Sequence, residues 1–192
     1  MKKLKKLLLV FAITLSTLCL ALGLVACDKN GDKEQITPVK GTAGLSYELS
    51  DDGAYYTCSG IGTCTATKIV IGNTYNNLPV TGIQDFAFED RVSLTSVTIA
   101  DGVTRIGSYT FSGCSALTKI TIPNSVTGIW NGAFSRCSAL TSVVFENTSG
   151  WSVIQFHDAS SKQQISSDDL SDSANAATYL TSNFCDYYWL RG

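Results

Sequence analysis

The most regular feature of the chain is a set of apolar positions that recur every 23 residues. Six such columns keep their register, and every member is aliphatic or aromatic. The columns are Val80/Val103/Val126, Ile83/Ile106/Ile129, Phe88/Phe111/Phe134, Leu94/Leu117/Leu140, Val97/Ile120/Val143 and Ile99/Ile122/Phe145. A unit of this length cannot bury its apolar side alone, so the pattern predicts stacked units that share one continuous core.

Within one unit, apolar and polar residues alternate, which predicts a short strand. Ile120 and Ile122 are expected to point into the core, and Lys119 and Thr121 to point outward. A turn, a second inward pair and a short helical turn complete the unit. Strands repeated in this way stack into a parallel sheet with about 4.8 Å between neighbours.

The repeat region is expected to cover residues 67–147. It contains two complete units, 95–117 and 118–140, and ends in a strand at 141–145. An earlier unit over 67–94 carries an insertion of five residues between Gly72 and Leu78. The predicted fold is therefore a short solenoid with four rungs, where a rung is one turn of the coil.

The flanking segments have the character of caps, which a solenoid needs at its open ends. Alternating residues on both sides of 50–53 predict a β-hairpin within an N-terminal cap at 44–66. In a C-terminal cap at 148–192, Asp172 precedes an alanine-rich run and predicts a short helix as far as Ser182. An aromatic segment follows at 184–189. Its rings would either seal the last rung or bind sugars, and the sequence leaves both open.

The segment from Ile69 to Asn147 resembles the BspA-like leucine-rich-repeat family. The motifs that carry the resemblance are Leu-Thr-Ser-Val-Thr-Ile, Val-Thr-Arg-Ile-Gly and Thr-Phe-Ser-Gly-Cys-Ser-Ala-Leu. The resemblance implies a surface-exposed bacterial protein that adheres to host or microbial ligands. The general repeat consensus has Asn or Cys at its ninth position, but Gly102, Ser125 and Thr148 stand there. The turns are therefore expected to close differently, and arguments from an asparagine ladder at the ninth position do not transfer to them.

The first 26 residues have the pattern of an export signal. A basic start is followed by an uncharged stretch over 7–26, which ends in Leu-Val-Ala before Cys27. This ending resembles the lipobox of bacterial lipoproteins, which implies cleavage before Cys27 and a diacylglyceryl group on its sulfur. The alternative is an uncleaved transmembrane helix over 7–26. We expect a signal peptide at 1–26, a flexible tether at 27–43 and a lipid anchor in the cell membrane.

The charge balance and the absence of catalytic motifs argue against several classes of function. The chain has 14 basic and 16 acidic residues, and four of the basic ones lie in the signal, so the remainder has a net charge of −6. No cluster of Lys and Arg is present in that remainder, which argues against nucleic acid as a partner. The sequence has no nucleophile elbow, zinc-protease motif or phosphate loop. We predict no catalytic residue, no metal site and no cofactor.

The cysteines leave several arrangements open. Cys58 and Cys64 are spaced to close a small hairpin by a disulfide. Cys114 and Cys137 share one repeat column and are expected on adjacent rungs, either bonded or, as we favour, as small buried apolar residues. The state of Cys185 is open as well.

The outward positions of the predicted sheet are mostly small or polar, and four strands give a narrow face for a standard interface. The candidate ligand-binding residues are Lys119, Thr121, Tyr75 and Trp130. Trp130 stands where the neighbouring units have Gln84 and Gly107, so the repeat does not require a large side chain there. It either anchors a ligand or packs on the next turn.

Three functions are compatible with these patterns. The first, which we expect, is a lipid-anchored surface protein that binds a host or microbial protein or glycan. The second is a carbohydrate-binding or structural envelope lipoprotein, for which exposed rings at 187–189 would be needed. The third is a hydrolase, which would require His157 beside a nucleophile in a cleft.

Overall fold

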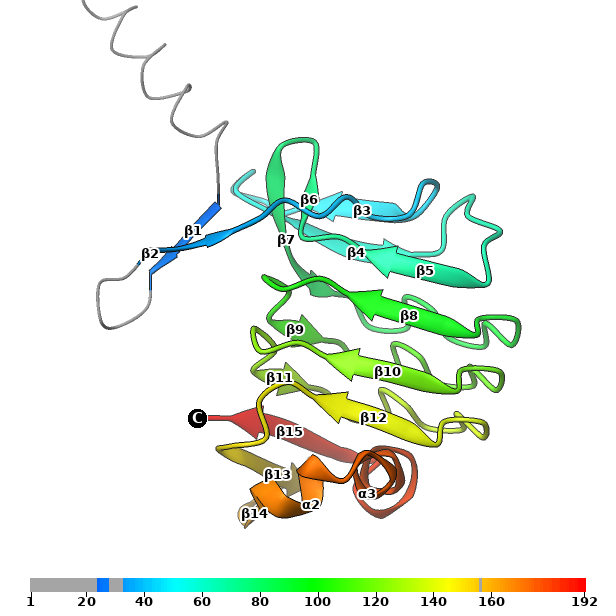
Figure 1. Cartoon of the computed structure of the whole chain (residues 1–192), viewed down its shortest axis with the longest axis vertical. Coiled ribbons are helices and arrows are strands. Elements are labelled where there is room, and N and C mark those ends of the chain that lie inside the picture. The colour runs from blue at the N-terminus through cyan, green and yellow to red at the C-terminus, as the bar shows by residue number, and fades with distance from the viewer. Residues whose placement is uncertain (1–23, 28–32, 156) are drawn as a thin grey trace, which may run out of the picture. The chain divides into compact units, whose positions relative to one another are not determined.

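The computed structural model describes residues 24–27, 33–155 and 157–192, and the chain divides after Pro38 into two compact units (Figure 1). In the first unit, β1 (Leu24–Cys27) pairs antiparallel with β2 (Lys33–Ile36). Residues 1–23, which hold most of the expected signal peptide, lie outside the described residues. Strand β2 lies within 27–43, so part of the expected flexible tether is a strand in this structure. Cleavage before Cys27 would remove most of β1, so this pairing would end with processing.

The second unit, residues 39–192, is a solenoid whose rungs form a four-stranded parallel sheet, termed the repeat sheet (Figure 1). Its strands in spatial order are β5 (Lys68–Ile71), β8 (Ser96–Ile99), β10 (Lys119–Ile122) and β12 (Ser142–Phe145). Lys119 pairs with Ser96 on one side and with Ser142 on the other, so the register follows the 23-residue period. Ile120 and Ile122 are buried and Lys119 is exposed, which confirms the predicted solenoid and the facing of its strands.

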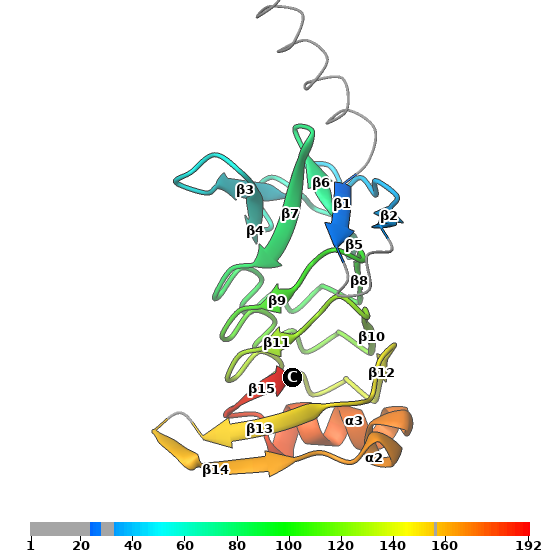
Figure 2. The ribbon, with the colours of Figure 1, turned by 90° about the vertical axis from the view of Figure 1, so that its left-hand side faces the viewer.

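A second sheet, termed the return sheet, lies on the opposite side of the coil (Figure 2). Its central strands are β7 (Leu78–Ile83), β9 (Arg105–Ile106) and β11 (Gly128–Ile129). They are parallel, with Ile106 paired to Ile83 and to Ile129. The sequence predicted only an inward-facing pair here, because a strand of two residues is too short to show alternation.

The core between the two sheets consists of the six repeated columns, all of which are buried. The phenylalanine column shows how closely the rungs match. The ring of Phe111 stacks on Phe88 at 5.4 Å and on Phe134 at 5.5 Å between ring centres. Stacked rings at such distances attract one another beyond the effect of burial alone. Phe111 therefore packs against the rungs on both sides.

The turns after the repeat sheet contain a ladder of polar side chains. Asn73 donates through Nδ2 to the main-chain oxygen of Asp101 at 2.7 Å, and Asn147 donates to Oδ1 of Asn124 at 3.1 Å. The main-chain N–H of Ser125 donates to the Asp101 carboxylate at 3.1 Å. These Asn and Asp side chains come from the eighth position of the repeat, so the turns are linked by side chains other than those of the ninth position.

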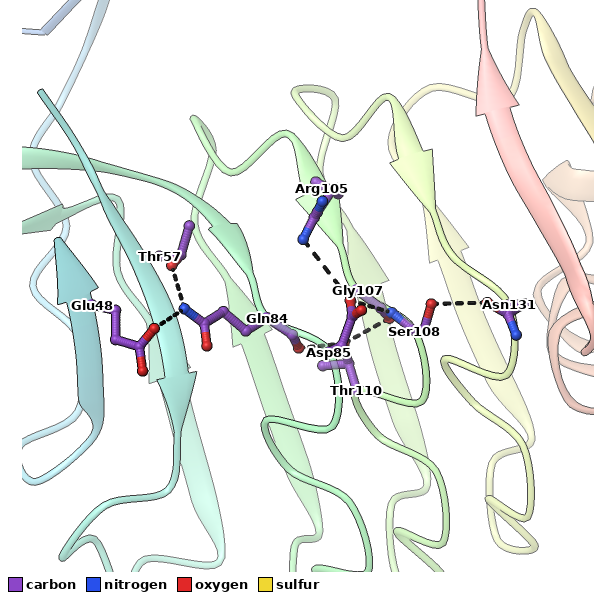
Figure 3. A network of polar contacts seen from close by, with 9 residues as sticks. All are labelled: Glu48, Thr57, Gln84, Asp85, Arg105, Gly107, Ser108, Thr110 and Asn131. Atoms are coloured by element: carbon purple, nitrogen blue, oxygen red, sulfur yellow. Dashed lines mark hydrogen bonds and ion pairs between the residues drawn. The ribbon is translucent and has the colours of Figure 1, made fainter. Parts of the chain in front are cut away.

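The N-terminal cap contains the predicted hairpin, formed by β3 (Ser46–Leu49) and β4 (Tyr56–Gly60). Strand β4 also pairs in parallel with β7, so the hairpin supplies a rung before the first repeat. Gln84, which follows β7, links the first repeat to the hairpin. Its Nε2 donates to Glu48 at 2.7 Å and to Thr57 at 2.9 Å (Figure 3). The insertion forms a second hairpin, in which β6 (Thr74–Tyr75) pairs with the start of β7.

The C-terminal cap contains the predicted helix as α3 (Ser173–Thr178), which continues into a π-helical turn, η1 (Tyr179–Asn183). The carboxylate of Asp172 accepts the N–H of Ala174 at 2.8 Å, which satisfies a main-chain donor of the first turn. A shorter helix, α2 (Ser167–Ser171), precedes it, and both helices pack against β12. They cover the edge of the repeat sheet and prevent it from pairing with another chain.

Three further strands of this cap were not predicted from the sequence. They are β13 (Trp151–Gln155), β14 (Asp158–Gln164) and β15 (Tyr187–Arg191). Strand β15 lies between β13 and β11 and runs antiparallel to both. The end of the described chain therefore returns to the last rung and extends the return sheet.

We expect Phe111→Ala to lower the free energy of unfolding by about 3–5 kcal/mol, because it opens a cavity between two rungs. Urea unfolding followed by circular dichroism measures the loss. Val92→Ala is the control, since Val92 is 62% exposed, and it should change stability by less than about 0.5 kcal/mol. A loss for Phe111→Ala as small as that of the control would contradict the stacked core.

Candidate functional site

The structure places the four candidate binding residues in three separate regions. Lys119 and Thr121 lie on the outer surface of β10 in the repeat sheet. Trp130 follows β11 in the return sheet, and Tyr75 lies in the β6–β7 hairpin that the insertion forms in the first repeat unit. The four residues therefore do not form a single site.

The outer surface of the repeat sheet offers few strong contacts. Its outward residues are Lys68, Val70, Ser96, Thr98, Lys119, Thr121, Ser142 and Val144. No aromatic ring and no arginine stands among these positions. Because Trp, Tyr and Arg supply most of the binding energy in typical interfaces, this surface is a weak candidate.

Trp130 has richer surroundings. Its indole lies beside Gly128, where a β-carbon would be 3.6 Å from the indole Nε1. The guanidinium of Arg105, one rung earlier, lies 4.9 Å from the ring centre, and Tyr188 of β15 meets the indole edge-on at 5.2 Å. Trp130 thus packs on its neighbours and still remains partly exposed.

Polar contacts orient Arg105 on this surface (Figure 3). Its guanidinium lies 3.9 Å from the carboxylate of Asp85, which also accepts the N–H of Ser108 at 2.9 Å. The hydroxyl of Ser108 donates to Oδ1 of Asn131 at 2.8 Å. An ion pair this exposed adds only about 0–1 kcal/mol to stability, so its main effect is on the position of the guanidinium.

The repeat position that directly follows Asp85 and Ser108 carries two aromatic residues in an unusual conformation. The rings of Phe86 and Tyr109 stack at 5.4 Å with their planes 4° apart. Both residues have positive φ, 60° and 52°, and the third member of the column is Gly132 at 67°. A left-handed conformation costs about 1–2 kcal/mol for a residue with a β-carbon. Two rings are therefore held at a surface turn in spite of local strain.

Tyr188 lies near both Trp130 and these rings. Partial burial, followed by the electrostatic effect of the nearby Asp85 and Tyr109 groups, raises the pKa of Tyr188 above its ordinary value. Its hydroxyl, like that of any tyrosine, is protonated at neutral pH. The surface formed by these side chains is termed the aromatic face. Its members are Phe86, Tyr109, Trp130, Tyr188, Arg105 and Asp85.

Of this surface, the sequence pointed to Trp130 as a candidate residue and to Tyr188 as part of the C-terminal aromatic segment. Phe86 and Tyr109 occupy a repeated position and did not stand out, although two aromatic residues aligned with a glycine were a usable signal. The C-terminal aromatic segment contains both a buried and a partly exposed ring, and its expected role in binding sugars stays a prediction. Trp189 is 1% exposed and seals the last rung, whereas Tyr188 contributes to the surface.

The remaining reactive side chains are either buried or scattered. The five cysteines of residues 39–192 are free thiols, and burial raises the pKa of Cys114 to about 11 and of Cys137 to about 12. Both lie in the core, as favoured from the sequence. His157 is exposed at the turn between β13 and β14. Within the described ranges, no three His, Cys, Asp or Glu side chains are grouped as metal ligands.

Comparison with known proteins identifies the repeat. The family described as BspA type leucine rich repeat region matches residues 63–172 in six copies, which is more than half of the chain. The match extends beyond β12 into the C-terminal cap. Among curated proteins, none matches the sequence.

A solved bacterial structure shares the architecture, and a second is similar in sequence. The leucine rich repeat protein of T. pallidum is 28% identical with a TM-score of 0.50, over 53% of this chain and 47% of that protein. A leucine rich cell surface protein of Faecalibacterium prausnitzii A2-165 is 30% identical with a TM-score of 0.46, over 58% of this chain and 33% of that one. The chain spans about half or less of the length of these two proteins.

We expect Gly132→Ala to destabilise the protein by more than the backbone strain of about 1–2 kcal/mol. Its β-carbon would lie 2.4 Å from Cε1 of Tyr109 and would displace that ring. Gly53→Ala is the matched control, because Gly53 also has positive φ, 70°, but has nothing within 4 Å of the new atom. Urea unfolding of both variants measures the difference. Equal losses would show that Gly132 does not support the aromatic face.

Proposed function

Because this chain belongs to the BspA-type leucine-rich-repeat family, we propose that it is a lipid-anchored bacterial surface protein that binds another protein in the manner of an adhesin. Repeats of this family typically act as binding modules rather than catalysts. The observation that carries the proposal is the aromatic face, where Trp130, Tyr188 and Arg105 meet on the return sheet.

A protein is the partner that best suits this surface. Trp, Tyr and Arg are the side chains enriched at the energetic centres of protein interfaces. Here the ring of Trp130 is already fixed between Arg105 and Tyr188, so little side-chain freedom is lost on binding. Leu190, which is exposed and lies beside Gly128 with Trp130, adds apolar area.

The size of the surface limits the strength of a single contact. A standard interface buries about 800 Å² on each partner, which would require loops around the aromatic face to take part. Many copies on one cell surface would compensate for a weak single contact, because binding of one molecule raises the effective concentration for the next. An anchored array is therefore the form in which this module would adhere.

The lipid anchor rests on the sequence around Cys27. Two acyl chains on its sulfur would be sufficient for stable attachment, since each buried methylene contributes about 0.8 kcal/mol. In the part of the chain that the structure describes, no helix is long and apolar enough to span a bilayer. Residues 27–43 would then act as the tether that separates the solenoid from the membrane.

A catalytic role has less support. A hydrolase would need His157 beside a nucleophile in a cleft, whereas His157 is exposed at a hairpin turn. Cys114 and Cys137 are buried with raised pKa values, so neither is a thiolate at neutral pH. A binding role requires none of these groups.

We expect Trp130→Ala to weaken binding to an immobilised partner by about 30-fold or more, which corresponds to the loss of an energetic centre. The measurement is binding of the mature protein to an array of host matrix and microbial surface proteins, followed by titration of each positive. Lys119→Ala, on the repeat sheet, should stay within about threefold of the wild type. If Lys119→Ala weakened binding more than Trp130→Ala did, the binding site would lie on the repeat sheet instead of the aromatic face.

We expect the solenoid to be cut from intact cells by an added protease, and the Cys27→Ala variant to be absent from their surface. Without the acceptor sulfur no lipid is attached, so that variant should be recovered in the medium. A wild-type protein protected from protease would favour an internal envelope role. A variant that stays in the membrane would instead indicate that residues 7–26 form a transmembrane helix.

A further inference from the structure

The N-terminal cap contains a cavity that the aromatic face does not share. It opens between the segment Lys40–Tyr47 and the tip of the β6–β7 hairpin, and its volume is about 790 Å³. Ligand pockets for small molecules generally measure about 300–1,000 Å³. The cavity is therefore large enough for two or three sugar rings.

The hairpin that borders this cavity is an addition to the repeat. The insertion places Asn76 and Asn77 at its tip, with φ of 48° and 64°. Two successive left-handed residues form the tight turn that joins twisted antiparallel strands, and Asn tolerates this conformation well. The hairpin thereby carries Tyr75 out of the rung and onto the wall of the cavity.

Tyr75 is held in place before any ligand arrives. Its ring stacks on Tyr47 at 4.3 Å with planes 19° apart, and Tyr56 meets it edge-on at 5.0 Å. Asn76 donates to the hydroxyl of Tyr56 at 3.4 Å. Tyr75 nevertheless remains 38% exposed. A fixed and partly exposed ring offers contact area with little loss of conformational freedom.

The hydroxyl of Tyr47 adds a second, independent observation. It is buried at the cavity wall and has no hydrogen-bond partner among the described residues. A buried hydroxyl without a partner costs about 1–3 kcal/mol, so such groups are normally satisfied by water or a ligand. Burial, followed by the neighbouring Cys58 and Tyr75, raises the pKa of Tyr47, so the hydroxyl keeps its proton.

The remaining lining determines the kind of ligand. Among the described residues around the cavity, Lys40 carries the only charge, and no carboxylate is present. The other polar groups are the hydroxyls and amides of Ser, Thr and Asn, together with main-chain groups of several glycines. This lining lacks the anionic group that a cationic ligand would need. It suits an uncharged molecule with many hydroxyl groups and one apolar side.

We propose that this cavity is a saccharide-binding site, in which the ring of Tyr75 packs against a sugar and the hydroxyl of Tyr47 hydrogen-bonds to it. A sugar ring has the required shape, because its C–H groups form an apolar side and its hydroxyls surround the edge. The site shares no residue with the aromatic face. A failure of the proposed protein binding would therefore not contradict the saccharide site, and a failure of saccharide binding would not contradict protein binding.

The test is isothermal titration of the mature lipid-free protein with maltotriose, cellotriose and triacetylchitotriose. We expect at least one of them to bind with a Kd at or below about 1 mM. Tyr75→Ala should weaken that binding by about 10-fold or more, because the stacking surface is lost. Tyr55→Ala is the matched control, since Tyr55 is also 38% exposed but does not line the cavity, and it should bind as the wild type does.

Tyr47→Phe separates a ligand role from a structural one. The unfolding midpoint in urea should stay equal or rise, because a buried unpaired hydroxyl is removed, while saccharide affinity should fall by about fivefold. Unchanged affinity of Tyr47→Phe or of Tyr75→Ala would overturn the proposal. So would the absence of binding by all three saccharides at about 10 mM.

Discussion

The structure depends on the main-chain hydrogen bonds that join each rung to the next. The N–H of Thr104 donates to the oxygen of Thr81 at 2.8 Å, and the N–H of Thr127 donates to the oxygen of Thr104 at 2.9 Å. Such bonds join equivalent positions, so a rung fits its neighbour only when both follow the same backbone path. Side chains at equivalent positions then lie next to one another through the whole stack. The apolar columns must therefore be apolar at every rung, because one polar or bulky member would disturb both neighbours.

The same bonds explain how the solenoid ends and why its ends were harder to predict. At the last rung, the N–H of Arg191 donates to the oxygen of Thr127 at 2.9 Å, and the N–H of Gly132 donates to the oxygen of Cys185 at 2.6 Å. The C-terminal segment thus supplies the partners that a further rung would supply. The repeat sheet and the capping helix follow from local pattern, and both were predicted. The pairing of β15 with β11 joins segments far apart in the sequence that share no period, so no local pattern revealed it.

The candidate site was predictable only where it departs from the repeat. Trp130 stood out because its neighbours in the column are Gln84 and Gly107. Phe86 and Tyr109 agree with each other, so they read as part of the regular structure, and their exposure follows from a left-handed turn that periodicity does not encode. Arg105 and Asp85 meet because they lie on adjacent rungs, a proximity that requires the register of the return sheet.

Each of the two proposed binding surfaces combines a residue of the repeats with a ring from a cap. Trp130 rests on Tyr188 of the C-terminal cap, and Tyr75 stacks on Tyr47 of the N-terminal cap. Because the backbone of each rung is fixed by its neighbours, large side chains can be added only at outward positions, insertions and caps. The aromatic face extends over consecutive rungs, because Asp85 lies in the same unit as Tyr75 whereas Arg105 and Trp130 lie in the two units that follow. The register between rungs therefore fixes where these side chains meet, whereas the insertion and the caps supply the rings that the repeat itself does not require.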